Sequence, residues 1–312
     1  MTSLIILATL ASAPASLSRT PLAHDGRTFH SPGRAYRAEV EYETRLTDFV
    51  PFSRFELYDA DSRLVYARPG EGITTLVISD QGVVVGAEFD GPVSGRARLR
   101  FFDPAGEELG RADIGFYGGQ EFSGDGSVFC VNDGRAGVRV FTSAGRELYD
   151  LGPASGFAVS ADGRQVVLVR EEALVLYRDG VEQARARLAG PLVRELRFSP
   201  DGGRAGYVER HGLRVFQTDD LMELLSWRPG PADPEPVSLD LAEDGRVLVG
   251  LGKAHGRMAV LLLAADGTEA WRQELTHERW NAFSPKVRFG PAGAITVETV
   301  EELETYGLGD ER

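Results

Sequence analysis

The chain has 312 residues, of which 42% are hydrophobic, and its 34 Lys and Arg against 47 Asp and Glu give a formal net charge of −13. So many apolar residues can bury a core, which excludes global disorder, and the acidic balance disfavours nucleic acid and anionic membranes as partners, because both bind basic faces. A single cysteine excludes an internal disulfide framework and a cysteine-based zinc cluster.

The first segment, residues 1–18, reads MTSLIILATLASAPASLS. Its apolar run Leu4–Leu10 is much shorter than the roughly 20 residues of a membrane-spanning helix, but it has the length of a secretory signal core. Small residues at Ala13 and Ala15 fit a signal-peptidase site, although no Lys or Arg precedes the run. We therefore expect a leader over residues 1–15, a domain over residues 16–312, and a periplasmic or secreted protein. The alternative is an outer strand or a disordered start in a cytoplasmic protein.

Hairpin turns closed by glycine recur along the rest of the chain. The clearest copy, Leu196–Val208, is an alternating strand, a Ser-Pro-Asp-Gly-Gly turn and a second strand. The turn glycines are Gly33, Gly82, Gly126, Gly163, Gly202, Gly245 and Gly293, with spacings between 37 and 49 residues.

A second mark recurs in the same order, an apolar pair that mostly ends in an aromatic and precedes a polar turn. Its copies are Leu57-Tyr58, Phe101-Phe102, Val140-Phe141, Leu176-Tyr177, Val215-Phe216, Leu262-Leu263 and, weakest, Thr305-Tyr306. Two marks with one period predict units of about 40 residues, each with four short strands, here named a, b, c and d. The first mark is the a–b turn of each unit and the second is its c–d turn.

Strand-only repeats of this length predict propeller blades. The seventh copy stops after its c strand, at Tyr306-Gly307, and would leave an unpaired edge. Residues from about Ser18 to Asp25 can supply the missing strand. We therefore predict an all-β fold, a single β-propeller of seven four-stranded blades closed by an N-terminal strand; six blades with an extra hairpin is the alternative.

The run Phe198–Tyr207 resembles the repeat of the WD40-like, TolB-type bacterial propellers. The other copies keep Ser and Gly but lose Pro or Asp, and the chain has no Trp-Asp dipeptide, so the hydrogen-bond tetrad of true WD40 repeats is not expected. Ala265–Trp271 resembles a quinoprotein-type repeat, but only this copy has the Trp, so we expect no quinone and no other cofactor. The resemblance implies a fold and closure by an N-terminal strand, and it leaves the function open.

In a propeller the b–c and d–a connections share one face, which we call the loop face. Here these connections are irregular and rich in charged and aromatic residues, the types that dominate binding surfaces. The longest run over Glu43–Ser53, Gly115–Gln120, Trp227–Pro236 and Leu275–Pro285. They carry the candidate binding residues Arg45, Phe49, Phe52, Tyr117, Trp227, Arg228, His277, Arg279, Trp280 and Phe283. The alternative is that these side chains only cover the ends of the blades.

Motifs for catalysis or metal binding are incomplete. The stretch His277–Asn281 begins like a zinc-protease helix but has Asn in place of the second His, and Gly250–Gly256 matches no nucleotide-binding loop. His211, His255 and His277 fall on the loop face and would bind a metal only by assembly across blades. We interpret them as solvated histidines and predict neither a metal site nor catalytic residues.

Acidic residues fall in several b–c connections: Asp90, Asp133, the pair Glu171-Glu172 and the pair Glu301-Glu302. Together they would ring the loop face with negative charge and favour a cation or a basic partner. The alternative interpretation is that they serve solubility.

The leading hypothesis is a non-catalytic scaffold that binds another protein through the loop face. The alternative is a propeller hydrolase or lactonase with a metal or acid–base site near the axis. The a strands offer such a site Glu121, Arg194, Arg197, Asp240 and Arg288, a mixed set. A third possibility is a purely structural role in a larger assembly.

Overall fold

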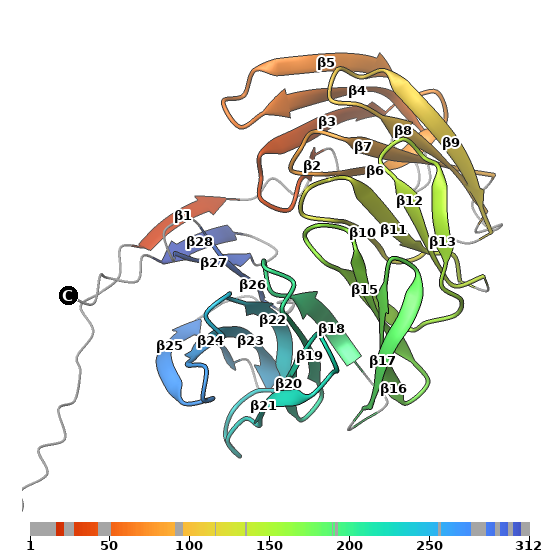
Figure 1. Ribbon diagram of the computed structural model, residues 1–312. Coiled ribbons are helices and arrows are strands. Elements are labelled where there is room, and N and C mark those ends of the chain that lie inside the picture. Colours follow the sequence, from red (N-terminus) through yellow and green to blue (C-terminus); the bar gives the residue numbers. More distant parts are fainter. Residues whose placement is uncertain are drawn as a thin grey trace, which may run out of the picture.

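The structure, a computed structural model, describes residues 17–21, 28–42, 51–90, 96–115, 117–134, 136–188, 190, 193–254, 257–275, 285–290, 294–298 and 302–306. These residues form seven four-stranded antiparallel sheets, arranged around a centre as the blades of a propeller (Figure 1). In the described ranges we find no helix long and apolar enough to cross a membrane.

The first four blades each take four consecutive strands. Blade 1 contains β2 (Thr28–His30), β3 (Tyr36–Tyr42), β4 (Phe52–Asp59) and β5 (Leu64–Pro69). Blade 2 contains β6 (Ile73–Ile78), β7 (Val84–Phe89), β8 (Ala97–Phe102) and β9 (Glu108–Ile114). Blade 3 contains β10 (Gln120–Phe122), β11 (Val128–Asn132), β12 (Val138–Thr142) and β13 (Glu147–Asp150). Blade 4 contains β14 (Gly156–Val159), β15 (Gln165–Arg170), β16 (Ala173–Arg178) and β17 (Val181–Arg187).

The last three blades include the one that closes the ring. Blade 5 contains β18 (Val193–Phe198), β19 (Arg204–Glu209), β20 (Gly212–Gln217) and β21 (Glu223–Trp227). Blade 6 contains β22 (Pro236–Leu241), β23 (Val247–Ala254), β24 (Arg257–Leu263) and β25 (Glu269–Leu275). Blade 7 contains β26 (Lys286–Phe289), β27 (Ile295–Glu298) and β28 (Glu302–Tyr306), and its fourth strand is β1 (Leu17–Pro21). The prediction of seven blades closed by an N-terminal strand is thus confirmed.

The hydrophobic core lies between neighbouring sheets. Strand β15 shows how, because its residues alternate between two cores: Val167 and Val169 pack with residues of blade 5, whereas Val166 and Leu168 pack with residues of blade 3. The second of these clusters includes Cys130, a fully buried free thiol that acts as a small apolar side chain. A b strand buried on both faces explains why these segments are continuous apolar runs.

The a–b turns of blades 3, 4 and 5 share one arrangement of Ser, Asp and Gly. In blade 4 the hydroxyl Oγ of Ser160 accepts a hydrogen bond from the Gln165 N–H at 2.9 Å and donates one to Asp162 Oδ1 at 2.6 Å. Gly163 closes the turn with φ of +69°. The glycines at 82, 126, 202 and 245 also have positive φ, as predicted, and Gly293 lies outside the described residues.

Blade 1 departs from the predicted turn. There the left-handed residue is Arg34, with φ of 59°, and not Gly33. Gly33 instead donates its backbone N–H to both carboxylate oxygens of Asp80 in blade 2, at 2.7 and 2.9 Å. An added Cβ at Gly33 would lie 2.9 Å from Asp80 Oδ2. A larger residue at position 33 would therefore displace the Asp80 carboxylate that joins the two blades, and the restriction here comes from this contact and not from φ.

We expect Gly202→Val to destabilise the protein by about 2 kcal/mol, because a β-branched residue is strongly disfavoured at a φ of +69°. The added Cβ would also lie 3.2 Å from Gln165 Nε2 of blade 4. Chemical denaturation monitored by circular dichroism measures the change. Gly156→Val is the control, since Gly156 has no positive φ and its Cβ would meet only Val169, at 3.8 Å. Equal stability of the two variants would contradict this account of the turn.

The c–d turns join each blade to the one before it. An added Cβ at Gly106 of blade 2 would lie 2.7 Å from the ring of Tyr66 in blade 1, and one at Gly180 of blade 4 would lie 2.3 Å from the ring of Tyr149 in blade 3. Blade 5 has no glycine at this turn; Leu221 adopts φ of 58° there and is 4% exposed. Its side chain belongs to the core between blades 4 and 5, against which Ala184 and Ala186 of β17 pack.

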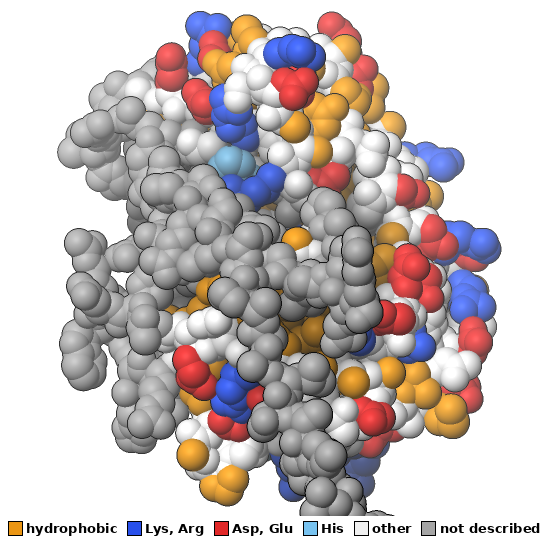
Figure 2. All heavy atoms as spheres, turned by 90° about the vertical axis from the view of Figure 1, so that its left-hand side faces the viewer, with side chains coloured by type: hydrophobic (Ala, Val, Ile, Leu, Met, Phe, Trp, Pro, Cys, Tyr) orange, Lys and Arg blue, Asp and Glu red, His pale blue; other side chains and the backbone are white. Residues whose placement is uncertain are grey.

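Charged side chains of both signs are mixed over the outside of the ring. Figure 2 shows Lys and Arg next to Asp and Glu over much of the described surface on that side. Many are paired, and Arg100, which is only 3% exposed, contacts Glu71, Glu88 and Glu108. Much of the charge on the sheet surfaces is thus neutralised by neighbouring side chains of opposite sign.

Candidate functional site

Several of the candidate binding residues fall where the structure is not described. These are Arg45, Phe49, His277, Arg279, Trp280 and Phe283. The described candidates are Phe52, Tyr117, Trp227 and Arg228.

Phe52 is a correction, because it is the first residue of β4 and not part of a loop. It is 2% exposed and packs against Phe29 and Tyr42, with ring centroids 5.8 and 5.3 Å away. Phe52 therefore belongs to the core. The sequence pattern alone did not distinguish a buried aromatic at the start of a strand from an exposed aromatic in a loop.

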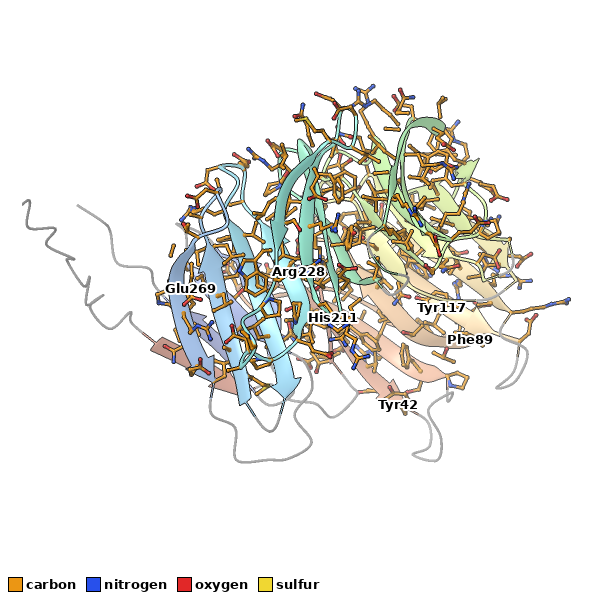
Figure 3. All side chains as sticks on the ribbon, turned by 90° about the horizontal axis from the view of Figure 1, so that it is seen from below. Tyr42, Phe89, Tyr117, His211, Arg228 and Glu269 are labelled. Carbon is orange, nitrogen blue, oxygen red and sulfur yellow. The ribbon has the colours of Figure 1, made fainter. Side chains whose placement is uncertain are left out.

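Tyr117, on the connection from blade 2 to blade 3, stacks edge-to-face on Phe89, with ring centroids 5.5 Å apart (Figure 3). It packs against the core between these blades, and burial raises the pKa of its hydroxyl well above the usual value. Trp227, the last residue of β21, likewise packs against the core between blades 5 and 6. Both aromatics therefore cover the ends of blades.

The connection from β21 to β22, residues 228–235, is held by ion pairs from both adjoining blades. Asp233 accepts two hydrogen bonds from Arg272 of β25, at 2.9 and 3.2 Å, and one from the Gly230 N–H at 2.9 Å. The hydrogen bond from Arg272 is the main reason that the pKa of Asp233 lies below its usual value. Glu235 binds Arg194 and also Arg210, the latter with a distance of 3.0 Å from Nε to Oε1.

This rigid connection presents Arg228 to solvent. Arg228 is exposed, and no carboxylate among the described residues pairs with it. Its Cγ lies next to Gly212, where an added Cβ would be 3.3 Å away, so it stands beside the b–c turn of blade 5 with His211 (Figure 3). Arg228 and His211 thus form an exposed basic corner on an otherwise acidic protein, and we call it the basic corner.

The predicted acidic ring on the same face is only partly present. Asp133 is 4% exposed and pairs with Arg139 at 3.2 Å, so it does not face a partner, which corrects its assignment to the ring. Asp90, Glu171 and Glu172 are exposed, and Glu301 lies outside the described residues.

The five polar a-strand residues named from the sequence line one central channel of about 950 Å³. Arg197 of blade 5 reaches Glu121 of blade 3 at 3.0 Å and Glu195 of its own strand at 2.7 Å. Burial raises the pKa of Glu121 above its usual value, and the positive charge of Arg197 opposes that rise. Burial alone would lower the pKa of Arg197, but Glu195 and Glu121 outweigh it and hold the pKa above the usual value.

Two channel carboxylates join one blade to the next through backbone N–H groups. Glu195 accepts a hydrogen bond from the Leu239 N–H at 3.1 Å, which joins blade 5 to blade 6. Asp240 accepts one from the Phe289 N–H at 2.7 Å, which joins blade 6 to blade 7. Burial raises the pKa of Asp240, while hydrogen bonds from the Phe289 and Leu241 N–H groups oppose the rise. The carboxylates therefore act as structural acceptors, and this arrangement does not resemble a free acid–base pair.

The sequence did not point to two further channel residues, Glu195 and Lys286. Strict alternation would place Arg194 and Arg197 on opposite sides of β18, but a register shift between Val193 and Glu195 brings Arg194 to the channel as well. In blades 5 and 7 the channel-facing residues lie two and four residues before the first residue of the a–b turn, which is Ser199 or Gly290. This rule would have identified Glu195 and Lys286 from the sequence.

Metal binding by the described side chains has no support in the geometry. Over the described ranges, no three His, Cys, Asp or Glu side chains gather at a metal-binding distance. Of the three histidines placed on the loop face, His211 is exposed and the other two lie outside the described residues.

Comparisons with known proteins bear on the fold. No family model matches the chain, and no curated protein matches it significantly. Among solved structures it is similar to KlHsv2 with loop 6CD replaced by a Gly-Ser linker, at 12% identity and a TM-score of 0.63. It is also similar to Hsv2 of Kluyvelomyces marxianus, at 10% identity and the same TM-score, and each match covers 87% of this chain and 88% of the other. At such low identity these likenesses show the fold alone: the chain is a β-propeller.

Proposed function

We propose that this protein is a non-catalytic propeller scaffold that binds another protein through its loop face. The observation that supports this most is the connection 228–235, which Arg272 and Arg210 hold in place while Arg228 stands free in solvent. A rigid connection loses little conformational entropy on binding, and exposed arginine is a residue type enriched among binding hot spots. The partner would present carboxylates to the basic corner.

The hydrolase hypothesis has weaker support. It needs polar groups at the axis that are free to bind substrate, whereas Glu121, Glu195 and Asp240 are engaged with Arg197 or with backbone N–H groups. Stoichiometric divalent metal in the purified protein would favour that hypothesis over the scaffold.

The proposal predicts that Arg228→Gln weakens partner binding by about 1–2 kcal/mol, because a charge-assisted contact is lost without loss of packing. The partner is first recovered from a lysate of the native organism by capture on the wild-type protein, and metal is measured in the same sample. Its affinity for the purified variant is then determined by calorimetry.

Arg146→Gln is the matched control for this experiment. Arg146 is also an exposed arginine with no ion pair among the described residues, but it lies at a c–d turn on the opposite face. The control should bind as the wild type does. A partner that binds both variants equally, or no stoichiometric partner at all, would contradict the proposal.

We propose separately that the protein is exported and that residues 1–15 are removed as a leader. Strand β1 begins at Leu17, so cleavage after Ala15 would leave the closing strand whole. The intact mass of the protein isolated from its native source reports whether residues 1–15 are removed.

A further inference from the structure

Blade 7 carries two cations on the channel side of its inner strand. Lys286 and Arg288 are two residues apart on β26, so their side chains lie on the same face of the sheet, and both line the channel. Val287, between them, is buried in the core between blades 6 and 7. Blade 7 therefore presents an ammonium and a guanidinium group to the channel.

The carboxylates of the channel already have other partners. Glu121 and Glu195 bind Arg197, Asp240 accepts from the Leu241 and Phe289 N–H groups, Asp80 accepts from the Gly33 N–H, and Glu298 pairs with Arg34. Neither Lys286 nor Arg288 forms an ion pair with any carboxylate in the described part of the chain, whereas Arg34, Arg194 and Arg197 all do. The positive charge that is not neutralised by a direct contact is thus concentrated on blade 7.

Opposite blade 7, two lining positions at the same level of the repeat are glycines. Gly119 of blade 3 and Gly156 of blade 4 lie four residues before Ser123 and Ser160, as Lys286 lies four residues before Gly290. Neither glycine has a positive φ, and an added Cβ would meet no atom closer than 3.8 Å. Glycine weakens a strand, and neither backbone conformation nor packing requires it here. Gly119 and Gly156 therefore narrow the channel less than longer side chains would, and the ring of Phe157, which also lines the channel, lies beside Gly119.

We propose that the central channel binds a small dianion, either a phosphate group or a dicarboxylate, between Lys286 and Arg288 and the glycine wall of blades 3 and 4. A guanidinium group can bind two oxygens of such an ion at once, and the ammonium group adds a point charge. The nearby carboxylate of Asp240 would repel the ion, but both of its oxygens face backbone N–H donors. This site lies at the axis and is independent of the basic corner on the loop face.

The test is calorimetry on the full chain at low ionic strength, with inorganic phosphate and succinate as separate probes. We expect one of them to bind at a single site, and we expect Lys286→Gln and Arg288→Gln each to weaken it by about tenfold or more. Added salt should weaken binding further, because the contact is electrostatic. Arg146→Gln is the control and should bind as the wild type does, since Arg146 lies outside the channel.

Tighter binding of phosphate would assign the site to a phosphate-bearing ligand, and tighter binding of succinate to a dicarboxylate. Absence of binding by both probes, or binding that persists unchanged in Lys286→Gln, would overturn the proposal. Lys286 is exposed, so its substitution keeps the test decisive even if Arg288→Gln does not fold. Arg228→Gln should leave anion binding unchanged, which separates failure of this site from failure of the loop-face scaffold.

Discussion

Removal of residues 1–21 is expected to destabilise the protein by on the order of 5 kcal/mol and to make it aggregate. Strand β1 pairs with β28 over five residues, from Leu17 opposite Tyr306 to Pro21 opposite Glu302. Without it, blade 7 would have three strands, and the backbone groups of β28 that face β1 would lose their partners. The N-terminal segment of the chain would also no longer pair with the C-terminal blade. Urea denaturation and size-exclusion chromatography measure the two effects.

Removal of residues 1–15 is the matched control for this truncation. It leaves β1 whole, since that strand begins at Leu17, and we expect its urea midpoint to equal that of the full chain. If the two truncated proteins unfolded at the same urea concentration, the N-terminal strand would not be what holds the ring closed.

Leu221→Ala is expected to cost about 3 kcal/mol, because a buried leucine is lost from the core between blades 4 and 5. Leu221→Gly should be no more destabilising than Leu221→Ala, although it removes one more carbon atom. Leu221 has φ of 58°, where alanine retains a strain of about 1 kcal/mol that glycine does not have. Thermal and chemical denaturation of the three proteins give this order.

Leu174 provides the control for Leu221. It is fully buried in the same core, and it lies on β16 where the pairing with β15 and β17 has no register shift. There glycine should be worse than alanine by about 0.5–1 kcal/mol, because glycine weakens a strand. If the glycine variant were less stable than the alanine variant at both positions, glycine would not release backbone strain at Leu221.

The blade number could be predicted from the sequence because each a–b turn depends on neighbouring residues. In blades 3, 4 and 5 a serine accepts a hydrogen bond from the N–H five positions later, as Ser160 does from Gln165, and a glycine with positive φ follows. Such a turn leaves a local pattern in the sequence that repeats from blade to blade. Blade 1 does not follow this pattern, because Arg34 and not a glycine adopts the left-handed conformation. The c–d turn of blade 5 also differs from those of other blades. The small alanines of β17 leave room there for Leu221, where other blades have glycine.

The candidate sites could be predicted only in part, because their partners are distant in the sequence. The alternation of an inner strand shows that Arg197 faces the axis, but its partner Glu121 is 76 residues away and two blades back. Asp233 and Arg272 are 39 residues apart, and only the packed blades reveal that this ion pair holds the connection that presents Arg228. A β-bulge also makes the direction of side chains hard to predict, as in β18. One extra residue there changes which residues of the strand face the channel.

The pairing of β1 with β28 also determines when blade 7 can be completed during synthesis of the chain. During synthesis β1 is among the first strands made, yet its partner follows about 280 residues later. Closing a loop of that length costs on the order of 5 kcal/mol of chain entropy, so the two strands gain little from meeting before the intervening blades have folded. At about 5–20 residues per second, β1 waits on the order of tens of seconds as an unpaired strand. During that interval the backbone groups of β1 are open to pairing with other chains.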